Sequence, residues 1–311
     1  MGKGQLHLQT EYLASESVKI IDFLNTQKEL SSLSKEQLKK VIKLGGVWLT
    51  TQSKTKKNTP RRVRRNDIEL RSGDKVEAYI DLDLLGEKGD YFKERLEGVQ
   101  QLFTQRSGYG CYYKPSSVHV QGTRFGDLYS MEGFFRRRKQ EVHLVHRLDF
   151  ETMGLILLAF NKRMAKFLSQ LFSERKIEKY YLARVVKENR AKNYPLGEWQ
   201  RIEKPLEDKM CVTEFFFITE DLVLVRLITG KRHQIRKHLS SLSYPILGDP
   251  LYGRKNKSEY GLQLAAYYLS FKDDLEKNRL YIAPWELLEE TFRIEREEKE
   301  LVRKAINSCS K

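Results

Sequence analysis

Cysteine is scarce in this chain: only Cys111, Cys211 and Cys309 occur among its 311 residues, and no two of them are close in sequence. A disulfide framework and a cysteine-rich zinc module both need closely spaced cysteine pairs, so the sequence excludes both. So few cysteines are typical of a reducing compartment. The hydrophobic content of 40% is nevertheless enough for an ordinary buried core.

Long apolar runs are also missing. The longest, from Met153 to Phe160, is far shorter than the ~20 residues that a membrane-spanning helix needs. The N-terminal stretch MGKGQLHLQTEY has no apolar segment of the signal-peptide kind, and Leu6 stands where a myristoylation motif has Ser or Thr. We therefore expect a cytoplasmic protein without a membrane partner.

Acidic residues are in the minority, with 42 Asp and Glu against 57 Lys and Arg, which gives a formal net charge of +15. Aromatic residues reach 11%. A basic, aromatic-rich chain without a membrane segment favours a polyanionic partner, most often nucleic acid. The alternative is a generally charged surface, because 32% of the residues are ionisable.

The first part of the chain, residues 15–82, predicts a small α/β unit. Ser34 and Gln37 form a capping-box pattern at the start of an amphipathic helix, which ends at Gly45. A short strand follows the helix, and an alternating strand at 76–80 comes after a Gly-Asp turn. The pattern indicates two helices followed by two strands.

This order of elements resembles the S4-like RNA-binding module, and the stretches LSKEQLKKVIKLGGVWL and LRSGDKVEAY carry the resemblance. The resemblance implies that the unit binds RNA. Between the two strands lies a basic run without an acid, which suits either a solvated loop or a loop that contacts phosphates. We predict phosphate contacts for its members, which are Lys54, Lys56, Lys57, Arg61, Arg62, Arg64 and Arg65.

The rest of the chain predicts a linker and a larger unit. Residues 83–106 are polar and of mixed charge, so we expect a partly helical linker there. Residues 107–311 predict an α+β fold built on a largely antiparallel, mixed sheet, because strands outnumber helices and follow one another directly. Strands are expected at 154–160, 179–186, 213–219 and 221–229, and helices after Asn161, at 233–243 and near the C-terminus.

One acidic residue precedes the most apolar strand of the chain. In the segment VHRLDFETMGLILLAF, Asp149 follows His146 and Arg147 and comes just before the strand. A carboxylate is costly to bury unless it is paired. Taken alone, the segment suits a turn-capping Asp149 paired with Arg147 at least as well as a catalytic acid.

Two further segments favour the catalytic interpretation. The stretches HRLDFETMG, KYYLA and GKRHQIRKHL…YPILGDPLYG resemble, in order and spacing, the HRLDxxTSG, KxYxA and GRTHQIRxHL…HPILGDxLYG motifs of the RluA-like pseudouridine synthases. The resemblance covers about residues 108–285 and implies an enzyme that isomerises uridine in rRNA or tRNA. It also implies that Asp149 is the catalytic acid, that Tyr181 lies against the target uracil and that Arg236 pairs with the acid.

The same segments supply residues that we expect to lie near RNA, namely His146, Arg147, Lys231, Arg232 and His233. Two departures from the family pattern bear on substrate preference more than on the reaction. Met153 replaces the serine of TSG, and Lys231-Arg232 replaces the Arg-Thr pair.

No cofactor or metal is expected. The family's reaction breaks the N1–C1′ bond, turns the base and rejoins it through C5, without net redox change or hydrolysis. His143 and His146 are three apart next to a predicted strand, so their side chains would point to opposite faces and make a poor metal site. We expect a monomer whose partner is RNA.

Two other functions remain open on the sequence. One is a non-catalytic RNA-binding or ribosome-assembly factor on an inherited synthase fold, which would have no need of Asp149, Tyr181 and Arg236 together. The other is an RNA-directed hydrolase, for which the sequence displays neither a metal site nor an activated water.

Overall fold

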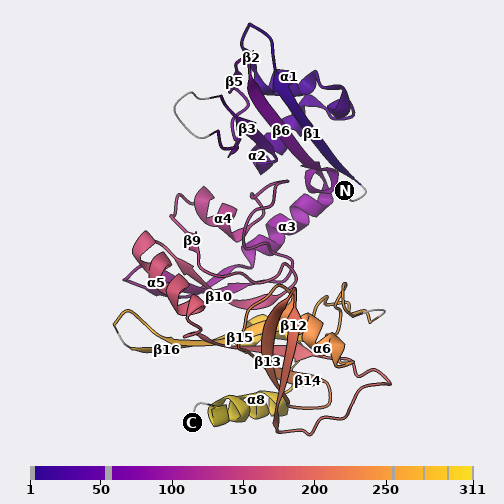
Figure 1. Ribbon diagram of the computed structural model, residues 1–311, viewed down its shortest axis with the longest axis vertical. Coiled ribbons are helices and arrows are strands. Elements are labelled where there is room, and N and C mark those ends of the chain that lie inside the picture. Colours follow the sequence, from indigo (N-terminus) through magenta and orange to yellow (C-terminus); the bar gives the residue numbers. More distant parts are fainter. Residues whose placement is uncertain (1–3, 53–57, 254–255, 276, 293, 310–311) are drawn as a thin grey trace. The chain divides into compact units, whose positions relative to one another are not determined.

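The computed structural model describes residues 4–52, 58–253, 256–275, 277–292 and 294–309 (Figure 1). The chain divides into two compact units. The N-terminal unit comprises residues 1–97 and 119–140, and the C-terminal unit comprises residues 98–118 and 141–311. Among the described residues, no helix combines the length and the apolar character needed to cross a membrane.

The unit boundaries differ from those expected from sequence. The predicted linker at 83–106 contains helix α3 (Glu87–Glu97) and strand β7 (Gln100–Gln105). Residues 119–140, expected in the larger unit, belong to the N-terminal unit. They are held there by contacts remote in sequence: the indole of Trp48 donates to the carbonyl of Arg124 at 3.1 Å.

The N-terminal unit is a four-stranded antiparallel sheet with helices. The strand order is β1 (Gln5–Tyr12), β6 (Asp74–Asp81), β3 (Val47–Thr50) and β4 (Arg61–Arg62). A separate two-stranded ladder joins β2 (Val18–Lys19) to β5 (Glu69–Leu70), and the α-helices of this unit besides α3 are α1 (Ile20–Asn25), α2 (Lys35–Leu44) and α4 (Met131–Arg137).

Helix α2 forms for the local reasons read in the sequence. The Ser34 hydroxyl accepts a hydrogen bond from the Gln37 amide, and the Gln37 side chain accepts one from the Ser34 amide, so the predicted capping box is confirmed. Gly45 ends the helix in the left-handed conformation, with φ of +87°. Leu38, Val41 and Ile42 of the helix are buried in the core of the unit.

The C-terminal unit is built on a ten-stranded sheet that is antiparallel except where β10 and β15 pair in parallel. The predicted α+β class with a largely antiparallel, mixed sheet is therefore confirmed. The strand order is β12 (Trp199–Leu206), β13 (Lys209–Phe217), β14 (Leu222–Leu227), β11 (Glu178–Arg184), β15 (Leu264–Lys272), β10 (Met153–Ala159), β8 (Tyr109–Lys114) and β7, while β16 (Asn278–Ile282) pairs with β15 and β9 (His143–Leu144) with β10.

Helices complete the hydrophobic core of this unit. Asn161 caps α5 (Lys162–Ser173) by accepting a hydrogen bond from the Met164 amide at 2.8 Å, as predicted. Side chains of α5, α7 (Trp285–Phe292) and α8 (Arg296–Cys309) pack with those of the sheet in one cluster. Helix α6 (Gln234–Ser241) carries the HQIR segment.

Candidate active site

Asp149 lies in the loop that joins β9 to β10. The Thr152 amide donates to the Asp149 carbonyl at 3.2 Å, which closes a turn before β10. Strand β10 then approaches β15 so closely that a Cβ at Gly154 would lie 2.2 Å from the carbonyl oxygen of Ala266, and Gly154 has φ of +109°. Glycine is therefore required at this position, and the turn and the close strand contact together place the Asp149 carboxylate.

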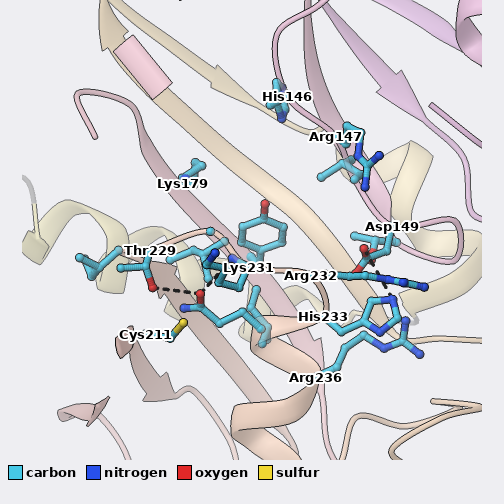
Figure 2. A pocket seen from close by; sticks show the side chains of 18 of the residues that line it. His146, Arg147, Asp149, Lys179, Cys211, Thr229, Lys231, Arg232, His233 and Arg236 are labelled. Atoms are coloured by element: carbon cyan, nitrogen blue, oxygen red, sulfur yellow. Dashed lines mark hydrogen bonds and ion pairs between the residues drawn. The ribbon is translucent and has the colours of Figure 1, made fainter. Parts of the chain in front are cut away.

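The Asp149 side chain lines a cavity of about 550 Å³ within the C-terminal unit (Figure 2). His233 lines the same cavity, and so do Tyr181 and Arg236. The structure therefore brings together the three residues predicted to be catalytic, Asp149, Tyr181 and Arg236. They come from the loop before β10, from β11 and from the start of α6. Met153, which departs from the family motif, is buried in the hydrophobic core.

Tyr181 reaches the cavity because side chains alternate along β11. Tyr180 and Leu182 belong to the hydrophobic core, so Lys179 and Tyr181 project from the other face of the strand and line the cavity. Burial, together with the charge of Asp149, raises the pKa of the Tyr181 phenol. The cavity therefore receives an aromatic ring with a protonated hydroxyl.

Arg236 is fully buried, and its direct partners are not those implied by the resemblance. Its Nε and one terminal nitrogen donate to the two oxygens of Asp249 at 2.8 and 2.7 Å, and the other terminal nitrogen lies 3.3 Å from Glu151. Burial opposes the charge of Arg236, but the bonds to Asp249 and the charges of Asp249, Glu151 and Asp149 outweigh it and raise the pKa of Arg236. Asp149 thus acts on Arg236 through its charge, without a direct hydrogen bond.

Asp249 is a site residue that the sequence reasoning missed. Its side chain is completely buried, and one oxygen also accepts hydrogen bonds from the amides of Leu251 and Tyr252, both at 2.9 Å. Burial alone would raise the pKa of Asp249, but these bonds and Arg236 lower it. The sequence signal for Asp249 was the stretch LGDPLYG, which carried part of the family resemblance, but no role was predicted for its aspartate.

His233 is the neighbour of Asp149 within ion-pair distance among the described residues. Its Nε2 lies 3.8 Å from Oδ1 of Asp149, and its Nδ1 lies 3.0 Å from the Tyr252 hydroxyl. The backbone at His233 has φ of +55°, a left-handed conformation that is unfavourable for a residue with a side chain. Burial lowers the pKa of His233 against the opposing effect of Asp149, so the imidazole is neutral at neutral pH.

Gln234 fixes the loop that carries Lys231, Arg232 and His233. Its side-chain nitrogen, Nε2, donates to the Val212 carbonyl and the Thr213 hydroxyl of β13, at 3.0 and 2.9 Å. Its side-chain oxygen, Oε1, accepts from the Lys231 backbone amide at 3.1 Å and from the hydroxyl of Thr229 at 2.9 Å. A buried side chain with this many partners holds the cavity wall in one arrangement.

His146 has a structural environment although it was predicted to lie near RNA. Its Nε2 accepts a hydrogen bond from the Leu157 amide at 2.8 Å, and its ring stacks on Phe172 with the centroids 4.4 Å apart. Burial, with a smaller effect of the Lys179 charge, lowers the pKa of His146 to about 3. The ring is therefore a neutral part of the cavity wall.

The cavity is strongly cationic. Asp149 is the single carboxylate among the described residues that line it. Besides Arg236, six basic side chains line it, and none of them has an ion-pair partner in the part of the chain that the structure describes. They are Arg147, Arg175, Lys179, Lys209, Lys231 and Arg232. Such a surface attracts an anion to the neighbourhood of Asp149.

The residues of the predicted phosphate-contacting run in the N-terminal unit differ in their contacts: some have protein partners, and one is exposed. Arg62 stacks over Trp48, 4.2 Å from the ring centroid, and donates to the carbonyls of Gly45 and Thr123. Arg64 is paired with Asp127, while Arg65 is paired at 2.6 Å with Asp67. Arg61 is exposed and has no ion-pair partner among the described residues. Lys54, Lys56 and Lys57 lie outside the described residues.

In the ranges described, no cluster of three or more His, Cys, Asp or Glu side chains is arranged to hold a metal ion.

The part of the chain that holds most of this site is similar to known proteins. Residues 108–241 match the sequence profile of the RNA pseudouridylate synthases. A Mycoplasma pneumoniae protein named as an uncharacterized RNA pseudouridine synthase is 33% identical over 184 residues, which cover 51% of this chain and 57% of that protein. The dual-specificity RNA pseudouridine synthase RluA of Vibrio cholerae is 38% identical over 146 residues, which cover 42% and 60%.

Residues 108–241 are therefore similar to the RNA pseudouridylate synthases, and one of the similar proteins is an RluA enzyme. The chain spans about half the length of the first curated relatives that it matches. Among solved structures, human RNA Pseudouridylate Synthase Domain Containing 1 has a similar fold, with a TM-score of 0.50 at 22% identity over 61% of this chain and 84% of that one.

Proposed function

We propose that this protein is an RNA pseudouridine synthase that isomerises uridine in structured RNA, either rRNA or tRNA, with Asp149 as its catalytic acid. The observation that carries the proposal is the position of Asp149, the single carboxylate that the described residues contribute to a cationic cavity lined also by Tyr181 and Arg236. The profile match over residues 108–241 supports the same reaction.

The reaction that we propose balances without an external reagent. The N1–C1′ bond of uridine breaks, a C1′–C5 bond forms, the proton on C5 leaves and N1 gains a proton. The ionised carboxylate of Asp149 serves as nucleophile towards the sugar or the base, or as the base that removes a sugar proton.

The other residues hold the nucleotide and the carboxylate. The target base has to leave its stack to reach a cavity of this kind, and the ring of Tyr181 offers it a stacking face, a contact worth ~1–3 kcal/mol in other proteins. Arg236 supplies a positive charge that is fixed by Asp249. Arg147 is exposed and two residues before Asp149, and we propose that it contacts the RNA backbone or fills the space left by the flipped base.

The N-terminal unit is proposed to tether the RNA as an S4-like module. Its two helices and basic strand follow the order of that module, and Arg61 offers a charge without a protein partner among the described residues. We propose that the protein acts in the cytoplasm as a monomer.

The test is a comparison of Asp149→Asn with wild-type protein on RNA from cells that lack the gene. Pseudouridine is mapped by carbodiimide labelling and reverse transcription, and RNA binding is measured in parallel. We expect wild type to restore specific positions, and Asp149→Asn to bind RNA with unchanged affinity but restore none. Asp208→Asn, in the exposed turn between β12 and β13, is the matched control and should behave as wild type.

Two other results have defined meanings. Pseudouridine formed by purified Asp149→Asn would refute the catalytic assignment. A wild-type protein that binds RNA but forms no pseudouridine would instead support the non-catalytic RNA-binding factor.

A further inference from the structure

Two cations lie at the part of the cavity formed by α5 and β11. Lys179 is two residues before Tyr181 on β11, so the two side chains project from the same face of the strand. Arg175 follows the C-terminal end of α5 with φ of +58°, and its side chain lines the same cavity. In Figure 2, Lys179 and His146 lie well apart from the group formed by Asp149, His233 and Arg236.

The carboxylates that could neutralise these cations are engaged elsewhere. Glu174, next to Arg175 in sequence, is paired with Lys176 at 2.7 Å. Glu178, next to Lys179, is paired with Arg226 at 2.9 Å. The described acids that flank the two cations in sequence therefore leave them unneutralised.

The remaining neighbours of Lys179 do not compensate its charge either. Its ammonium lies 5.8 Å from the ring centroid of Phe172, and His146, whose pKa the charge of Lys179 lowers, is neutral. Burial lowers the pKa of Lys179, and the like charge of Arg175 lowers it further. A half-buried lysine that feels the like charge of the exposed Arg175 is unfavourable in the free protein, and an anion bound to both side chains would remove that cost.

We propose that Arg175 and Lys179 form a binding site for one backbone phosphodiester next to the target uridine. The proposal rests on the function proposed above, because RNA is the anion that reaches this cavity. Lys179 and Tyr181 are two residues apart on β11, so their Cα atoms are about 7 Å apart along the strand. If the uracil stacks on Tyr181, that spacing is on the scale of a single nucleotide. Lysine supplies a point charge and arginine a planar fork for the phosphate oxygens.

This site would position the nucleotide without taking part in bond making. Fixing one phosphate at a distance from Asp149 defines how deep the base enters the cavity and which sugar face meets the carboxylate. The cost of a half-buried lysine without an ion-pair partner among the described residues is then explained by binding, because sites built for ligands are commonly unfavourable for stability.

The first experiment separates a binding role from a structural one. Lys179→Gln, Arg175→Gln and the double variant are compared with Lys166→Gln, an exposed lysine on α5, for thermal stability and for RNA binding. Binding is measured in the Asp149→Asn background with an unmodified tRNA transcript, so this arm needs no chemistry. We expect each site variant to reduce the slope of log affinity against log salt by about one and to melt no lower than the parent.

The second experiment identifies the phosphate. In a stem-loop RNA that contains a mapped uridine, the phosphates on either side of it are replaced one at a time by neutral methylphosphonate. We expect one replacement to raise KM about tenfold for wild type and to have little further effect on the double variant. The double variant should raise KM more than it lowers kcat.

The outcomes are distinguishable. If the site variants change salt slope and KM no more than Lys166→Gln does, or if methylphosphonate harms the double variant as much as wild type, the phosphate site is refuted. A protein that forms no pseudouridine refutes the proposed function, while the salt-slope comparison still decides whether Arg175 and Lys179 bind the RNA backbone.

Discussion

The imidazole of His233 lies 3.8 Å from the carboxylate of Asp149, closer than the guanidinium that the family resemblance pairs with it. Arg236 has its hydrogen bonds with Asp249 and Glu151. Because the Tyr252 hydroxyl is 3.0 Å from Nδ1 of His233 and can donate to it, the neutral ring would carry its proton on Nε2, which faces Asp149. The Tyr252 hydroxyl can thus fix the tautomer in which the Nε2 proton of His233 faces the Asp149 carboxylate.

This arrangement predicts that Tyr252 and His233 act as a unit. Tyr252→Phe removes the hydroxyl that selects the tautomer, so we expect kcat to fall severalfold with little change in KM. His233→Ala should cost more, and adding Tyr252→Phe to it should cost almost nothing further, because the shared interaction is already lost. Single-turnover rates of the four proteins measure this coupling, and losses that simply add would show that Tyr252 acts on something else.

A second prediction concerns the buried pair of Arg236 and Asp249. Asp249→Asn removes the negative partner that binds two nitrogens of a fully buried guanidinium, and we expect the free energy of unfolding to fall by about 3–5 kcal/mol. Urea unfolding measures the change. Glu36→Gln, which breaks the exposed pair with Lys39, is the control and should cost less than about 0.5 kcal/mol. Equal losses for the two variants would contradict a structural role of Asp249.

A third prediction uses the low pKa of His146, which burial holds at about 3. The unfolded chain has an ordinary histidine that gains a proton as the pH falls through about 6.5, while the folded protein stays neutral there. The unfolded state therefore binds more protons, and stability falls as the pH drops from 7 towards 3, by about 2 kcal/mol at pH 5. Urea unfolding at pH 7 and pH 5 tests this.

The matched variant for that measurement is His146→Phe, which retains a ring against Phe172 but cannot titrate. It is expected to lose some stability at pH 7, because the Leu157 amide loses its acceptor. Its stability should then depend less on pH between 7 and 5 than that of wild type. The same pH dependence in both proteins would mean that another group is responsible.

The features that the sequence predicted correctly depend on close neighbours along the chain. The capping box of Ser34 and Gln37, the Asn161 cap and the strand pair β13–β14 each involve residues within one turn or hairpin. Asp149 and Tyr181 were singled out by motif order, and their segments meet at one cavity, while their catalytic roles stay a prediction.

The features that were missed depend on contacts between distant segments. The partner of Arg236 is on a loop beyond the end of α6, and no periodicity marks Asp249 as buried. The attachment of residues 119–140 to the N-terminal unit depends on Asp127, which is paired with Arg64 and Arg136. The charge pattern alone could not show that an arginine of the basic run already has a protein partner.

A fourth prediction separates the arginines of that run. Arg61 is exposed without an ion-pair partner in the described ranges, so Arg61→Gln should reduce the salt slope of RNA binding by about one and leave thermal stability unchanged. Arg62 stacks on Trp48 and bonds to two backbone carbonyls, so Arg62→Gln should lower thermal stability and leave the slope near that of wild type.

Salt titrations and melting curves of the two single variants provide the comparison. Because both changes remove one positive charge at neighbouring positions, general electrostatic attraction is reduced equally, and any difference in slope reports direct phosphate contact. An unchanged slope for Arg61→Gln would mean that this strand does not meet the RNA backbone. A reduced slope for Arg62→Gln, with unaltered melting, would mean that its guanidinium leaves Trp48 when RNA binds.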